Sequence, residues 1–207
     1  MGGDGVVDPS NEVTIAASVV YPQGPWDREA GDTLNRKPMQ TRASASQPDE
    51  QGRWTVTVRQ RADERAAWTD VQSLTLSLDE RGAILLHELT TFTRGTRAVF
   101  SPALALCPPV ISGSPHQATS QVRSTGLDGS SDVRTGTAQA TAVAAAVEHA
   151  SEARLTLTIN LGPAKITRSA TYIVPAGAQM PSAERSELVV KGGPFVLQRE
   201  VRERSAR

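Results

Sequence analysis

The chain has 207 residues, of which 38% are hydrophobic and only 4% aromatic, and its 22 Lys and Arg residues balance 22 Asp and Glu residues. A chain of this length can bury most of its apolar surface in a single domain, whereas the balanced charge lacks the basic excess of a typical nucleic-acid-binding protein. No apolar run is long enough for a transmembrane helix.

The start of the chain is rich in Gly and Asp, which predicts a flexible tether over residues 1–11 and a single folded domain over 12–204. The tether has neither the basic nor the apolar segment of a secretory signal peptide. Such a tether is expected where a secreted or lipid-anchored protein has lost its signal peptide, and equally at the start of a cytoplasmic protein. Both locations stay open at this stage.

Short extended segments separated by turn residues predict an all-β fold with little helix. The expected strands of the first half are residues 12–21, 39–46, 53–61, 71–78, 83–93 and 96–100. Those of the second half are residues 117–124, 132–141, 155–161, 164–174, 182–190 and 195–203. The Ala-rich stretch 138–153 has helical propensity, but its alternating start favours a long strand that turns near His149.

Two similar runs, Leu74-Thr-Leu-Ser-Leu78 and Leu155-Thr-Leu-Thr-Ile159, lie 81 residues apart. Alternation of this kind marks a strand with one buried face. The turn and the strand that follow also match at this spacing, which predicts a duplicated hairpin. We therefore expect two similar halves, 12–101 and 116–204, joined by a Pro-rich linker over 102–115. Together they would form one antiparallel sheet curled into a half-barrel or open barrel.

Candidate catalytic and metal-binding residues are sparse. The one cysteine, Cys107, follows an apolar run and is expected to be a buried, inert thiol. The three histidines are scattered along the chain, at positions 87, 116 and 149. The chain has no metal-ligand spacing, no Gly-x-Ser-x-Gly elbow and no phosphate-binding glycine loop. We expect no enzyme activity, no metal and no cofactor.

Two charged clusters have simple interpretations. The cluster Asp27–Asp32 has three carboxylates but not the spacing of a calcium loop, which favours a solvated loop. The C-terminal arginines Arg199, Arg202, Arg204 and Arg207 alternate with glutamates, which favours a solvated edge strand.

The remaining candidate site is an apolar face. It consists of Leu74, Leu76, Leu78, Leu155, Leu157 and Ile159. These side chains are ordinary core if a second layer covers them, and they line a cavity for an apolar ligand if the sheet is a half-open barrel.

The second half, over residues 134–204, resembles bacterial envelope proteins of the lipoprotein-carrier type. The resemblance lies in Leu155–Ile159, the Gly-Pro turn, the segment Thr171–Gly177 and the Glu-bearing strand 182–190. It implies a secreted or lipid-anchored protein that holds an acyl chain inside the half-barrel. The leading hypothesis is a non-enzymatic envelope protein whose concave apolar sheet face binds a lipid-like ligand or packs against a protein partner. The alternatives are a structural or adaptor β-domain without a cavity and a hydrolase with a site dispersed in its loops.

Overall fold

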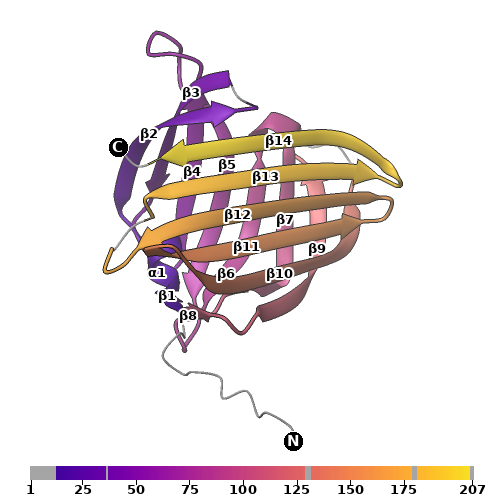
Figure 1. The fold of residues 1–207 in the computed structure, drawn as a ribbon. Coiled ribbons are helices and arrows are strands. Elements are labelled where there is room, and N and C mark those ends of the chain that lie inside the picture. The colour runs from indigo at the N-terminus through magenta and orange to yellow at the C-terminus, as the bar shows by residue number, and fades with distance from the viewer. Residues whose placement is uncertain (1–12, 36, 129–131, 179–180, 206–207) are drawn as a thin grey trace, which may run out of the picture.

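The computed structural model describes residues 13–35, 37–128, 132–178 and 181–205, so the predicted tether lies outside the described residues. Twelve antiparallel strands close into one β-barrel (Figure 1). The prediction of an all-β antiparallel barrel with little helix is confirmed, and the barrel is closed where the sequence left its edges open. No helix in the described part of the chain is long and apolar enough to cross a membrane.

The strands follow one another closely along the chain. The first half contains β1 (Thr14–Ala16), the short helix α1 (Ala17–Val20), β2 (Trp26–Leu34), β3 (Lys37–Ala45), β4 (Trp54–Arg61), β5 (Thr69–Leu78), β6 (Ile84–Thr91), the 3₁₀ turn η2 (Phe92–Arg94) and β7 (Thr96–Cys107). The second half contains β8 (Val110–Ser112), β9 (His116–Gly126), β10 (Arg134–Val147), β11 (Ala150–Leu161), β12 (Ala164–Pro175), β13 (Ala183–Gly192) and β14 (Phe195–Ser205).

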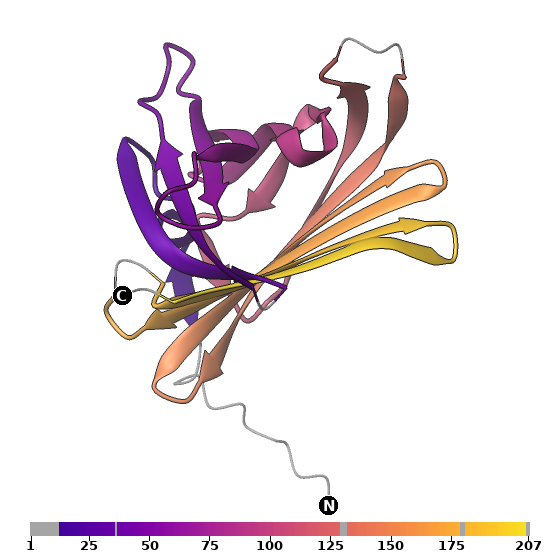
Figure 2. The same ribbon diagram turned by 90° about the horizontal axis from the view of Figure 1, so that it is seen from above.

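Around the barrel the strand order is β10-β11-β12-β13-β14-β2-β3-β4-β5-β6-β7-β9, while β1 and β8 form a separate pair. Figure 1 shows β10 to β14 running across β4 to β7, which lie behind them. Figure 2 shows, from above, the hairpins of the second half spreading away from the first half. The seam between β14 and β2 has only three residue pairs, from Arg202–Leu34 to Arg204–Asp32.

A barrel of twelve strands has a lumen wider than side chains fill in an eight-stranded barrel. The lumen is narrower on one side, because β10 contacts β7 and β8 there in addition to its hydrogen-bonded neighbours. The inward residues of β10 there are alanines, all almost fully buried: Ala138, Ala140, Ala142 and Ala144. Their small side chains allow the backbones to approach closely. The long strand predicted over the Ala-rich stretch is confirmed, with a turn at His149.

Four sequence-based assignments need correction. The expected strand 12–21 is only β1, because after three pairs with β8 the Ala17 amide donates to the Pro109 carbonyl, 2.9 Å away, and α1 begins. The expected linker 102–115 contains the second part of β7 and all of β8. Proline is tolerated at Pro102 because the β6–β7 ladder is interrupted between Val99 and Leu104.

The other two corrections concern charged strands. The expected solvated loop at Asp27–Asp32 lies inside β2, and the expected edge strand is β14, which pairs with β13 on one side and β2 on the other. Both strands carry charged side chains on both faces, so apolar alternation does not reveal them.

The two runs that predicted a duplicated hairpin lie on β5 and β11. Leu74 and Leu155 are both inward-facing and buried, as are Leu76 and Leu157. The pairing register of the two hairpins matches at this spacing on one side of a bulge in β5, since Leu74 pairs with Leu89 and Leu155 pairs with Ala170. Beyond the bulge at Thr75/Leu76 the register differs by one residue. In addition, β5 and β11 are five strands apart around the barrel, whereas two equivalent halves of a twelve-stranded ring would place them six apart.

Candidate functional site

The lumen contains two adjoining cavities, of about 390 Å³ and about 80 Å³. Gln72 on β5 and Arg168 on β12 border both. The Arg168 guanidinium donates a hydrogen bond to the Gln72 side-chain oxygen. Because β5 and β12 are six strands apart in the ring, this hydrogen bond spans the lumen and separates a large chamber from a small one.

One wall of the large chamber is apolar. It is formed by inward side chains of β3 to β7 and β11: Ala43, Val56, Leu74, Leu86, Leu106, Leu155 and Leu157. This wall follows from period-2 alternation, since every second residue of these strands faces the lumen. The expected pattern therefore does bring leucines from both halves of the chain to one cavity.

The six apolar residues singled out from the sequence have different positions. Leu74, Leu155 and Leu157 border the large chamber, and Leu157 and Ile159 border the small one. Leu76 is 0% exposed and lines neither cavity, while Leu78 is 43% exposed at the end of β5. Leu76 is thus a core residue and Leu78 a surface residue.

The opposite wall of the large chamber is polar, and sequence reasoning missed it. It comes from four consecutive strands of the ring, β12, β13, β14 and β2, which contribute Arg168, Glu184, Ser186, Arg202, Arg204 and Arg28. The side chains of Arg202 and Arg204 are only 18% and 27% exposed. Because these arginines face inward, β14 is not the solvated edge strand that its alternating charges predicted.

Two carboxylates neutralise part of this wall. Glu184 pairs with Arg204 at 3.4 Å, and Glu200 pairs with Arg202 at 3.7 Å. Arg28 instead places its guanidinium 5.0 Å from the centre of the Trp26 ring. Burial, followed by repulsion from Arg204, lowers the pKa of Arg28.

The segment that follows β1 forms one side of the large chamber. Val19, Val20 and Tyr21 line it beside Tyr172 of β12, and the two phenols share a hydrogen bond. Burial raises the pKa of Tyr21 to about 12 and raises that of Tyr172 well above its usual value. Both phenols therefore stay neutral and present apolar rings to the cavity.

A second hydrogen bond across the lumen lies in the small chamber. Arg94 in η2 donates to the Gln198 side chain of β14 at 2.6 Å. The Gln198 amide in turn donates to Glu200. Glu200, Arg202 and Arg204 of β14 line the chambers, and Gln198 continues this row of polar side chains toward Arg94.

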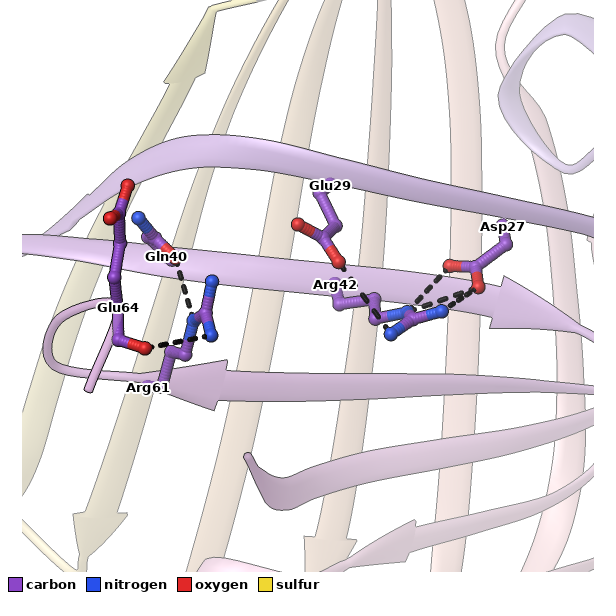
Figure 3. Close-up of polar contacts among 6 residues, drawn as sticks. All are labelled: Asp27, Glu29, Gln40, Arg42, Arg61 and Glu64. Atoms are coloured by element: carbon purple, nitrogen blue, oxygen red, sulfur yellow. Dashed lines mark hydrogen bonds and ion pairs between the residues drawn. The ribbon is translucent and has the colours of Figure 1, made fainter. Parts of the chain in front are cut away.

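The outer face of β2 to β4 carries a different charged cluster. Figure 3 shows Arg42 pointing toward Asp27 and Glu29, with Arg42 Nε 2.9 Å from Asp27 Oδ1. Arg61 nearby donates to Gln40 at 2.6 Å and to the Glu64 carbonyl at 3.2 Å. A groove of about 760 Å³ lies beside them.

This outer cluster neutralises itself. Hydrogen bonding from Arg42 lowers the pKa of Asp27, and Asp27 and Glu29, two of the three carboxylates of the Asp27–Asp32 cluster, face this guanidinium. No group of three or more His, Cys, Asp and Glu residues that could hold a metal is found among the described residues.

Outside the lumen, Ser77 Oγ and His87 Nε2 lie 2.8 Å apart on neighbouring strands. Burial is the main cause that lowers the pKa of His87. Neither residue lines either chamber of the lumen or the outer groove, so neither faces one of these spaces for a substrate. Cys107 is fully buried, as expected, and burial raises its pKa to about 12.

Comparison with known proteins gives no match for this chain, whether to a family model, to a curated protein or to a solved structure.

Proposed function

We propose that this protein binds an elongated, lipid-like molecule inside its barrel and is not an enzyme. The observation that carries the proposal is the large chamber of about 390 Å³ with its continuous apolar wall. Small-molecule sites are typically concave, mostly apolar spaces of roughly 300–1,000 Å³ with a few polar groups. A purely structural β-domain would have no need to keep such a space open, since interiors are normally close-packed.

The groups around the chamber favour binding over catalysis. The described residues that line it include neither His, Cys nor Lys. Its tyrosines have raised pKa values, and Glu184 is ion-paired with Arg204. These groups lack an activated nucleophile with an adjacent base.

The position of the apolar face favours a small ligand over a protein partner. Leu155 and Leu157 face the interior of a closed barrel, which a folded partner cannot enter. A secreted or cell-surface location, as the resemblance to lipoprotein carriers implies, is part of the proposal and is checked by fractionation of the native host cell.

A chain-length series tests the proposal. Displacement of an environment-sensitive dye by neutral n-alcohols should become stronger with each added methylene until the chamber is full, because each methylene contributes about 0.8 kcal/mol. Native mass spectrometry of the purified protein should show added mass from a co-purifying lipid. Absence of saturable binding at every chain length, in a folded protein, would overturn the proposal.

A matched pair of variants localises the binding. Ala170 of β12 lines the large chamber, whereas Thr167 is on the outer face of the same strand and pairs with Thr158. Ala170→Phe should reduce the longest alcohol that binds, because the ring occupies part of the chamber. Thr167→Phe should leave the series unchanged. Equal effects of the two variants would place binding elsewhere.

A further inference from the structure

We propose that the ligand of the large chamber carries an anionic head group, bound by Arg28 and Arg168. This inference rests on the proposed function and adds the chemistry of the ligand. The class is a single-chain amphiphile whose head presents negatively charged oxygens, either a carboxylate or a phosphate.

The polar wall of the large chamber is rich in positive charge. Four arginines line the large chamber from inward-facing positions of their strands: Arg28, Arg168, Arg202 and Arg204. Glu184 pairs with Arg204, and Glu200 pairs with Arg202. Glu29 also borders the chamber, but it pairs with Arg42 of the outer cluster at 3.6 Å.

No carboxylate of the described residues pairs with Arg28 or Arg168. Among the described residues, Arg28 contacts the Trp26 ring and Arg168 donates to the neutral Gln72. Both residues are partly buried, and a charge removed from water is normally paired because its transfer is costly. The large chamber therefore has an excess of positive charge that a bound anion would neutralise.

The two chambers also contain unpaired hydrogen-bond donors. Among the described residues, the buried side-chain atoms without a partner include Gln72 Nε2, Arg204 Nε and, in the small chamber, Arg94 Nε. All three are N–H donors. The other two such atoms, Trp54 Nε1 and Gln60 Oε1, belong to residues that line neither chamber. Buried donors in native proteins normally find an acceptor, and the oxygens of a carboxylate or phosphate would supply acceptors to the donors of the chambers.

The geometry also separates head from tail. The guanidiniums belong to β12, β14 and β2, while the apolar wall belongs to β3 to β7 and β11. An amphiphile can therefore place its head against one wall and its chain against the other. Arg168 fits a carboxylate or phosphate because a guanidinium donates two parallel hydrogen bonds to such a group.

The experiment compares four ligands with the same alkyl chain: dodecanoate, dodecyl phosphate, dodecanol and dodecyltrimethylammonium. Isothermal titration calorimetry with delipidated protein should give at least tenfold tighter binding of an anionic ligand than of dodecanol. The stronger of the two anions identifies the head group. Equal affinity for dodecanol and both anions would overturn the anionic head group while leaving the proposed function intact, and failure of all four would overturn both.

Variants test the assigned residues. Arg168→Gln and Arg28→Gln should each weaken binding of the anionic ligand about tenfold without changing the affinity for dodecanol, which also shows that the variants are folded. Arg168→Lys should retain part of the preference, because it keeps the charge. The control is Arg199→Gln on the outer face of β14, where Arg199 pairs with Glu187 at 2.7 Å. A loss in the control equal to that in Arg168→Gln would refute the assignment.

Discussion

Truncation of two inward-facing leucines should have different costs. Leu76 is completely buried and borders neither cavity, whereas Leu157 borders both. Leucine-to-alanine replacement removes three carbon atoms, worth about 2.4 kcal/mol at roughly 0.8 kcal/mol for each. At Leu76 it also creates a new cavity, which brings the expected loss to about 3–5 kcal/mol.

At Leu157 the side chain already faces empty space, so truncation enlarges a cavity instead of creating one. We expect Leu157→Ala to lower the free energy of unfolding by only about 2 kcal/mol. Urea denaturation of delipidated protein measures both values, with the same dependence on urea concentration expected for both variants. Equal losses, or a larger loss for Leu157→Ala, would refute the assignment of the two leucines to core and cavity wall.

Three further perturbations follow from the structure. Gly136→Ala should prevent stable folding, measured by circular dichroism, because an added Cβ would lie 1.7 Å from a backbone oxygen of β11. Burial keeps Tyr21 and Tyr172 protonated in the folded protein, whereas both ionise near pH 10 in the unfolded chain. The free energy of unfolding should therefore fall as the pH rises from 10 to about 12, and tyrosinate absorbance near pH 10 in the folded protein would contradict this. Gln72→Leu should cost about 1–3 kcal/mol by leaving a guanidinium unpaired, whereas adding Arg168→Met should recover that loss in urea denaturation.

The apolar half of the fold was predictable from the sequence. Leu74, Leu155 and Leu157 alternate with small polar residues, and this alternation fixes which side of β5 and β11 faces the lumen. The Ala-rich β10 was recognisable for the same reason. What the sequence did not determine was the closure of the barrel, because the β14–β2 seam joins two strands about 170 residues apart through only three pairs.

The polar half of the site was missed because its strands have no apolar face to mark the inward positions. In β14, Arg202 and Arg204 face the lumen while Arg199 faces outward. Both faces contain Arg and Glu, so the residue types alone give no orientation. One signal was present: the spacing of Arg202 and Arg204 by two residues places them on the same face of any strand.

The inward arginines need an explanation beyond stability. Replacing buried ion pairs with apolar residues is often neutral or stabilising, so the Glu184–Arg204 pair is weak evidence for a stability role. In this barrel the aromatic residues are few, and the twelve-stranded lumen is too wide for its aliphatic side chains to fill. An unfilled chamber costs stability, and so do two guanidiniums with no carboxylate partner in the described part of the chain. A bound amphiphilic anion would remove both costs at once, because its chain would fill the apolar space and its head group would pair with Arg28 and Arg168.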